Sequence, residues 1–222
     1  MFFRRHRVTS AIAIVIVLAL VYLLGWSNYF TTKEISYLGA PTKSSQLAVK
    51  KLADISTGER LARIETRKVS ARIKTLPWIK SVDISRNWIN GQVLVSVEAR
   101  LPIATFNGQL MDAEGKRFEL PGGYKENLPS VFARDTKSGL AAIELFMNLP
   151  SEFSTRTSAF TASSPENIFF NIKEGKKTLL VIWGNGKDTA FKIKVYKALL
   201  ALPENSKIKK IDLTDPRSPI VK

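Results

Sequence analysis

The residue types that carry out acid–base, nucleophilic or metal chemistry are scarce in this chain of 222 residues. It contains no cysteine, and its single histidine, His6, lies in a run of arginines near the N-terminus. A thiolate nucleophile, a disulfide framework and a cysteine-ligated metal are therefore excluded, and no histidine-based triad or zinc site can form in the rest of the chain. We expect no catalytic residue, no metal and no cofactor.

Two short motifs match catalytic signatures only in part. Ser206-Lys207-Ile208-Lys209 has the letters of Ser-x-x-Lys, but it leads into a predicted strand, whereas that motif needs a helical turn to bring Ser and Lys together. Gly184-Asn185-Gly186 lacks the Gly-Lys-Ser/Thr of a nucleotide-binding P-loop, so a simple turn is expected there. The sequence therefore favours a binding protein over an enzyme.

The charge balance is strongly basic. Lys and Arg total 34 against 19 acidic residues, and only Arg4, Arg5 and Arg7 precede the long apolar run, which leaves 31 against 19, or +12, for the remainder. Such a charge suits nucleic acid, anionic lipid headgroups or a polyanionic wall polymer equally well, so charge alone does not choose among them.

The first 30 residues predict a membrane anchor. No charge occurs from Val8 to Trp26, about 19 residues that would span about 28 Å as a helix, close to the thickness of a bilayer core. The arginines precede this run, so the positive-inside rule keeps residues 1–7 in the cytoplasm and residues 31–222 outside it. A cleaved signal peptide is disfavoured because residues 24–28 offer no small-x-small cleavage site. We assign residues 8–30 to a transmembrane helix and its interface.

Residues 31–101 predict a small layered module of order β-α-α-β-β. The pair Asn90-Gly91 is a favoured hairpin turn, and the valines after it alternate with polar residues, as in a strand with one buried face. The other predicted elements are a strand at 34–39, a helix at 45–52 capped by Ser44 or Ser45, and a helix capped by Thr66 that runs through Leu76 until Pro77 stops it.

Residues 102–222 predict a second module, mainly antiparallel β with flanking helices, so the fold class is α+β. Strands are expected at 103–106, 109–112, 115–120, 158–162, 168–173, 178–183 and 208–213, with a short last stretch at 218–222, and helices at 138–148 and 188–202. The second helix should bury the stripe Phe191, Val195, Ala198, Leu199 and Leu202, with Lys192, Lys194 and Lys197 on the solvated face.

The order of these parts resembles the FtsQ/DivIB family of bacterial cell-division proteins over nearly the whole chain. The most specific segment is residues 76–88, LPWIKSVDISRNW, which resembles the family pattern of Leu-Pro-Trp-Val, a strand, then Arg-x-Trp. Thr57-Gly58, residues 111–115 and Ile211-Asp212-Leu213 match in order and spacing. Ile89 departs from the family's usual Pro, and Ala99 from its common Arg.

The resemblance implies a POTRA domain at 31–101, an FtsQ-type β domain at 102–222, and a non-enzymatic scaffold of the division machinery. Implied partners are FtsB/DivIC-like and FtsL-like proteins and, through them, the septal peptidoglycan synthase; the bilayer holds the anchor, and no nucleic acid is expected. The implied location is the cell membrane at the septum. The alternative is a basic extracytoplasmic module that binds anionic wall polymer or lipid headgroups.

The resemblance further implies that the late part of the β domain binds FtsB by adding a partner strand to an exposed sheet edge. Pro216, Pro219 and the Lys-rich flanks either shape that docking surface or guard the edge against aggregation. Trp78 and Trp88 favour core packing, and Arg86 either holds an acidic partner or solvates the hairpin. The expected partner-binding residues are Lys192, Lys209, Ile211, Leu213, Arg217, Ser218, Ile220 and Val221, with Arg86 and Trp88 expected to act in recruitment.

Overall fold

A computed structural model describes residues 12–19, 21–22 and 29–222 of the chain. These residues form two compact units, one up to residue 100 together with 120–123, and one of residues 101–119 and 124–222. Residues 12–19 and 21–22 are helical. Among the described residues no helix is both long and apolar enough to cross a membrane. The predicted tail at 1–7, and much of the predicted anchor at 8–30, lie outside the described residues.

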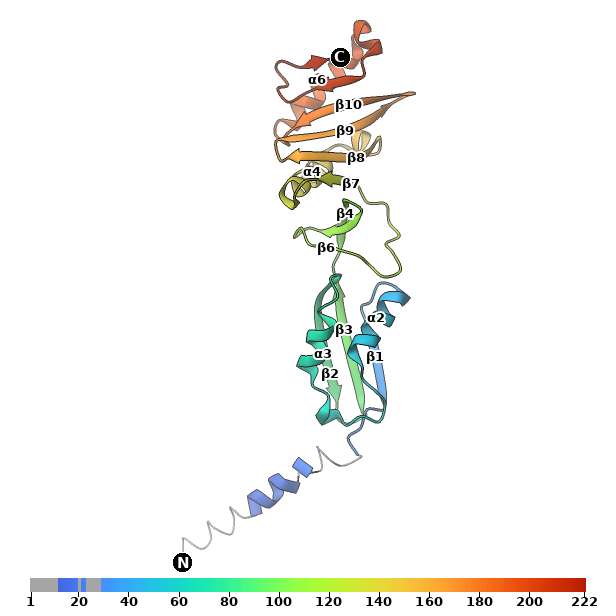
Figure 1. The fold of residues 1–222 in the computed structure, drawn as a ribbon, viewed down its shortest axis with the longest axis vertical. Helices are drawn as coiled ribbons and strands as arrows, with labels where there is room; N and C mark the ends of the chain where they lie inside the picture. Colours follow the sequence, from blue (N-terminus) through green and yellow to red (C-terminus); the bar gives the residue numbers. More distant parts are fainter. Residues whose placement is uncertain (1–11, 20, 23–28) are drawn as a thin grey trace, which may run out of the picture. The chain divides into compact units, whose positions relative to one another are not determined.

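The first unit has the predicted β-α-α-β-β order (Figure 1). Its sheet has the order β1-β3-β2, with β1 parallel to β3 and β2 antiparallel to it. The two longer helices contact each other and the sheet. The elements are β1 (Glu34–Leu38), α2 (Lys43–Ala53), the 3-10 helix η1 (Leu61–Arg63), α3 (Thr66–Ile73), β2 (Ile79–Asn87) and β3 (Gln92–Ala99).

Local details of this unit differ from the sequence-based expectation. Helix α2 is capped by Thr42 instead of Ser44 or Ser45, because Ser45 at the third helical position completes a reciprocal capping box with Thr42. Helix α3 begins at Thr66 and ends at Ile73, short of Leu76. The hairpin loop holds four residues, 88–91, between the paired Asn87 and Gln92, instead of a two-residue Asn90-Gly91 turn.

The core of the first unit confirms the predicted strand alternation. Val93, Val95 and Val97 are all buried, as is Trp78, whose predicted core role is thereby confirmed. A buried aromatic ring of this size contributes more apolar area than any of the valines. The hairpin therefore packs into the core of the unit through its inner face.

The second unit is a nine-stranded sheet with the order β12-β11-β10-β9-β8-β7-β4-β5-β6. Five of the eight strand pairs in residues 101–222 are antiparallel, as predicted, but β4·β7, β7·β8 and β10·β11 are parallel. The strands are β4 (Pro102–Phe106), β5 (Gln109–Asp112), β6 (Arg117–Phe118), β7 (Ser130–Ala133), β8 (Thr157–Ser164), β9 (Asn167–Glu174), β10 (Lys177–Gly184), β11 (Lys210–Asp212) and β12 (Ile220–Val221). Strand β7 had no sequence-based prediction, because four residues show too little alternation.

Helices supply the crossovers that parallel strands require. Helices α4 (Thr136–Asn148) and α5 (Ser151–Ser154) connect β7 to β8, while α6 (Thr189–Ala201) and the 3-10 helix η2 (Pro203–Lys207) connect β10 to β11. One hydrophobic cluster joins helices and sheet, and rings of Phe153, Phe170, Trp183 and Tyr196 meet inside it.

The buried face of α6 agrees with the predicted one only in part. Val195 and Leu199 pack against the hydrophobic cluster, and Lys194 and Lys197 are exposed, as predicted. Lys192 and Tyr196 are buried, whereas Phe191 is 45% exposed and Leu202 is 43% exposed. The helix is thus turned by about one residue from the predicted stripe, which corresponds to about 100°. The reason is that Lys192 finds hydrogen-bond acceptors inside the unit, so a cation occupies a place that the apolar pattern assigned to solvent.

Gly139 in α4 provides a test of packing in the second unit. A Cβ at this position would overlap the ring of Phe106 in β4. We expect Gly139→Ala to lower the free energy of unfolding by about 1 kcal/mol or more, because overpacking of about 1–3 kcal/mol exceeds the helix-propensity gain of about 1 kcal/mol. Urea denaturation followed by circular dichroism measures this. Gly186→Ala is the control, since its added Cβ would meet no atom within 4 Å; equal stability of the two variants would contradict the prediction.

Candidate functional site

Strand β12 forms one edge of the nine-stranded sheet. It pairs antiparallel with β11, with Ile211 opposite Val221 and Asp212 opposite Ile220. On its other side β11 pairs in parallel with β10, so β11 is enclosed between two strands. At this end of the sheet only β12 offers a side to which a further strand can be added. We call residues 214–222 the terminal edge.

The backbone of β12 presents a defined hydrogen-bonding pattern. Lys222 and Lys210 each donate to the other's carbonyl over 3.0 Å. Because bonded and non-bonded pairs alternate in antiparallel strands, the N–H and C=O of Val221 point away from β11. The next outward position is Pro219, which has no N–H. The outer side of β12 therefore offers a donor and an acceptor at Val221 and an acceptor alone at Pro219.

The structure separates the predicted partner-binding residues by exposure. Ile220 is 55% exposed, whereas Ile211 and Leu213 are fully buried in the hydrophobic cluster. The side chains of Ile211 and Leu213, two of the expected partner-binding residues, thus pack in the core and present no surface at the terminal edge. Val221 is half-buried against the same cluster.

The turn between β11 and β12 is ordered by side-chain hydrogen bonds. Asp212 accepts from the backbone N–H of Thr214 over 3.0 Å, and Asp215 accepts from that of Arg217 over 3.0 Å. Arg217 and Ser218 are both exposed. The turn thus carries Arg217 at one end of β12 on a preformed backbone.

Lysines gather at the opposite end of β12. The backbone N–H of Lys209 donates to the carbonyl of Lys222 over 2.7 Å, so the last residue lies beside the start of β11. Lys177, Lys207 and Lys209 line a small hollow there, and Lys177 donates to the carbonyl of Ser206. The end of the terminal edge at Lys222 is therefore basic, which favours a partner strand with an acidic flank on that side. At the other end, Arg217 shares its turn with Asp212 and Asp215.

Lys192 does not belong to this surface. It is 2% exposed, and its ammonium donates to the carbonyls of Trp183 over 2.6 Å and Asn185 over 3.0 Å. Burial lowers the pKa of Lys192 from its ordinary value, while the charge of Asp188 opposes that shift. Lys192, which the sequence placed among the partner-binding residues, ties α6 to the end of β10 in this structure.

Arg86 and Trp88 lie in the first unit. The guanidinium of Arg86 donates to the carbonyls of Leu61 over 2.8 Å and Ile64 over 3.1 Å, and it lies 5.3 Å from the ring centroid of Trp88. Trp88 is half-buried and meets the ring of Phe30 edge-on at 6.1 Å. Arg86 therefore works first as a tie between the hairpin and η1, a role that sequence reasoning missed because its acceptors are backbone carbonyls.

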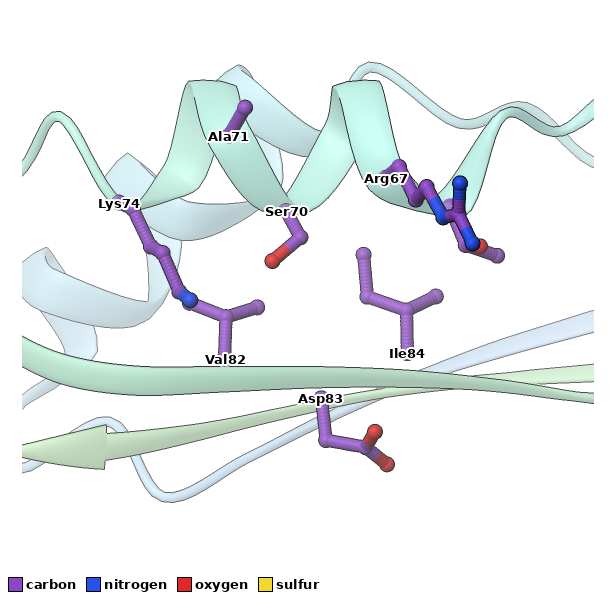
Figure 2. A pocket seen from close by; sticks show the side chains of 8 residues that line it. Arg67, Ser70, Ala71, Lys74, Val82, Asp83 and Ile84 are labelled. Atoms are coloured by element: carbon purple, nitrogen blue, oxygen red, sulfur yellow. The ribbon is translucent and has the colours of Figure 1, made fainter.

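An open hollow lies between α3 and β2 (Figure 2). Val82 and Ile84 point from β2 towards the helix, Asp83 points to the other face of the sheet, and Arg67 and Lys74 flank the opening. No group of three or more His, Cys, Asp and Glu residues able to hold a metal ion occurs in the part of the chain that the structure describes. The polar groups at the hollow include the Ser70 hydroxyl and the flanking Arg67 and Lys74, which lie beside the apolar Val82 and Ile84.

Comparison with known protein families covers both units. The family model for a POTRA domain of FtsQ type matches residues 30–100, and the model for the C-terminal part of cell division protein FtsQ/DivIB matches residues 99–214. The chain belongs to the FtsQ/DivIB family of cell division proteins. The resemblance inferred from the sequence is thereby confirmed.

Two Streptomyces proteins are similar to this FtsQ/DivIB chain over most of its length. Cell division protein FtsQ of Streptomyces coelicolor is 26% identical over 223 residues, covering 89% of this chain and 83% of that protein. Cell division protein FtsQ of Streptomyces venezuelae is 26% identical over 240 residues, covering 97% and 86%. The C-terminal FtsQ/DivIB match ends at residue 214, so β12 lies beyond it.

Tyr196 provides a pH-dependent link inside the FtsQ/DivIB C-terminal unit. Its hydroxyl donates to Glu174 over 2.8 Å, and Glu174 also pairs with Arg156. Burial, followed by the hydrogen bond and charge of Glu174, raises the pKa of Tyr196 above its ordinary value. The folded state therefore keeps a proton that the unfolded state loses above about pH 10.

We expect Tyr196→Phe to reduce stability by about 1–2 kcal/mol at neutral pH, because it removes a hydrogen bond to a carboxylate. The stability contributed by the raised pKa is fully present below about pH 10 and is lost as pH rises further. The stability gap between wild type and Tyr196→Phe should therefore narrow above pH 10 in urea titrations. A gap that stays constant or widens between pH 9 and pH 11.5 would contradict this assignment.

We expect Lys192→Met to lower the free energy of unfolding by about 1–3 kcal/mol, because the carbonyls of Trp183 and Asn185 lose a buried donor. Thermal denaturation followed by circular dichroism measures the change. Lys194→Met, at an exposed position of the same helix, is the matched control and should stay within about 0.5 kcal/mol of wild type. Equal effects at both positions would show that Lys192 is not a buried tie.

Proposed function

We propose that this FtsQ/DivIB protein is a non-enzymatic, membrane-anchored scaffold of the division machinery that captures an FtsB/DivIC-like partner at the terminal edge. The partner would add one strand to β12. An FtsL-like protein would join through that partner, and the septal peptidoglycan synthase would be reached indirectly. The residues proposed to contact the partner are Lys209, Arg217, Ser218, Ile220 and Val221.

The single observation that carries this proposal is the outward N–H and C=O of Val221 on an edge strand. Main-chain bonds of this kind give affinity to strand addition, and neighbouring side chains give selectivity. The other end of the sheet is less suited for a different reason than length, since β6 and β12 each hold two residues: in β6, Phe118 is buried and Arg117 lies over the ring of Phe106. At β12, by contrast, Ile220 offers an exposed apolar side chain.

Pro219 limits the length and direction of the added strand. It offers no donor on the outer side, so pairing with a partner would centre on Val221, with the carbonyl of Pro219 as a further acceptor. The proline also guards against unlimited strand addition between copies of the chain. In this proposal Pro219 both shapes the docking surface and guards the edge against aggregation, the two alternatives inferred from the sequence.

The proposed anchor raises the effective concentration of the partners. Residues 8–30 would form a single membrane-spanning helix with residues 1–7 in the cytoplasm and both units outside it, in the cell membrane at the septum. Confining two chains to one membrane makes their encounter nearly intramolecular. A short added strand is then sufficient for capture even though it buries little area.

Replacing Val221 separates the backbone from the side chain. Val221→Pro removes the outward N–H but leaves the bonds between β12 and β11, whereas Val221→Ala keeps the N–H and shortens the side chain. We expect Val221→Pro to weaken binding of the full-length chain to the extracytoplasmic part of its FtsB-like partner about tenfold, which corresponds to one net hydrogen bond of about 1.4 kcal/mol. Val221→Ala should bind within about threefold of wild type.

Pulldown in detergent followed by titration measures these affinities, with circular dichroism to verify folding. Arg217→Glu should also weaken binding, more strongly at low salt, while Lys137→Glu at the start of α4 makes the same charge change away from β12 and should have no effect. If Val221→Pro binds as well as Val221→Ala, strand addition at this edge is wrong. If the intact chain binds no FtsB-like protein even with FtsL present, the scaffold proposal fails as a whole.

A further inference from the structure

The end of the β2–β3 hairpin carries an exposed apolar cluster that the partner-binding edge does not use. Tyr29, Phe30, Lys33, Trp88 and Ile89 line one open hollow, which we call the hairpin-tip cluster. Ile89 is 95% exposed and Tyr29 is 85% exposed. A large aliphatic side chain exposed to this extent beside aromatic rings marks an interaction surface more than a packing site.

The hairpin-tip cluster is held in place by the backbone. The N–H of Leu61 donates to the carbonyl of Phe30 over 3.0 Å, and that of Lys33 donates to the carbonyl of Gly91 over 2.8 Å. Gly91 has a φ of 78°, and a Cβ there would lie 2.6 Å from the carbonyl oxygen of Thr31. The segment at residues 30–33 therefore lies directly against the hairpin loop.

Arg86 contacts the cluster through the ring of Trp88. Its guanidinium lies 5.3 Å from the ring centroid of Trp88 while it donates to the carbonyls of Leu61 and Ile64. Trp88 in turn packs edge-on against Phe30. The rings are thus held in place before any ligand arrives, and Ile89 is carried outward on the loop.

The position of the cluster along the chain indicates what covers it. Tyr29 follows Leu24, the end of the apolar run, by five residues, which reach at most about 18 Å when fully extended. The first unit begins at the same end as the hairpin loop (Figure 1). If the apolar run spans a bilayer, the hairpin-tip cluster cannot lie far from the bilayer surface.

The chemistry of the cluster suits a lipid interface. Trp and Tyr favour the headgroup region, where an apolar ring and a polar tip are both satisfied, and Lys extends its amine to the headgroups. Basic residues near an anionic leaflet add attraction. Three cationic residues lie at the cluster: Lys33 lines it, Arg60 pairs with Thr31 beside it, and Arg86 lies against the ring of Trp88.

We propose that the hairpin-tip cluster docks on the outer surface of the bilayer, inserting Ile89 and the rim of Trp88 at the level of anionic headgroups. This inference rests on the membrane anchor of the proposed function. Docking orients the first unit on the membrane, because the hairpin loop and residues 29–33 approach the surface together.

The absence of cysteine from the chain permits single-probe experiments. Full-length Ile89→Cys and Leu38→Cys variants are labelled with an environment-sensitive fluorophore and reconstituted into vesicles of phosphatidylcholine and phosphatidylglycerol that carry lipid-attached quenchers. Leu38 is the matched control: it is a 57% exposed apolar residue at the far end of β1 in the same unit. We expect the Ile89 probe to be quenched severalfold more than the Leu38 probe, because an interfacial group lies about 5–10 Å into the headgroup boundary.

A tether variant distinguishes docking from mere proximity. A flexible Gly/Ser insertion after Asn28 lengthens the connection; quenching of the Ile89 probe that persists there supports docking, and quenching that falls to the Leu38 level overturns it. In the longer-tether form, Lys33→Glu should weaken quenching of the Ile89 probe only when the vesicles contain phosphatidylglycerol. If the longer-tether form without this substitution is quenched equally in vesicles with and without phosphatidylglycerol, the role of anionic headgroups is overturned.

Failure of the anchor has a separate readout. If the chain does not float with vesicles after an alkaline wash, the anchor is wrong and the docking inference falls with it. If the chain floats but the probes at residues 89 and 38 are quenched equally, the anchor stands and docking alone is overturned. Capture of the FtsB-like partner at β12 is measured independently of both results.

Discussion

The parallel insertion of β11 between β10 and β12 is the constraint on which the second unit depends. Parallel neighbours cannot be joined by a tight turn, so the chain must cross over, and α6 with η2 makes that crossing. The crossover places α6 near the sheet, where Tyr196 meets Phe153 and Lys192 reaches the carbonyls at the end of β10. Because β11 is enclosed, β12 forms the edge of the sheet.

This arrangement buries the apolar side chains at and just after β11 and leaves the outer side of β12 exposed. Ile211 and Leu213 anchor the inserted strand in the core, so a partner cannot reach them without unfolding the edge. Ile220 and the outer backbone of Val221 remain accessible. Capture of a strand would then need little rearrangement of the protein, since the turn at residues 214–219 is already ordered by Asp212 and Asp215.

In the first unit, backbone groups likewise hold the hairpin in place. Gly91 permits the backbone at Thr31 to approach, and Arg86 joins the hairpin to η1 through carbonyls that no side-chain pattern reveals. Together these contacts hold residues 30–33 against the hairpin loop. The segment that enters the unit and the hairpin loop therefore lie at the same end of it.

Sequence alone determined much of this molecule, because its signals are local. The α+β class followed from the alternation of apolar residues in the strands, the β-α-α-β-β order and the core position of Trp78. The FtsQ/DivIB family followed from that order together with the segment at residues 76–88. Tertiary structure decided what depends on neighbours distant in the chain. The order of strands in the sheet determines the parallel pairs and the pairing of β7. The same order determines which face of α6 is buried and why Ile211 and Leu213 are enclosed. From the sequence alone, a lysine such as Lys192 is predicted to be exposed to solvent. Its burial is favourable only because the fold places the carbonyls of Trp183 and Asn185 within hydrogen-bonding distance of its ammonium group.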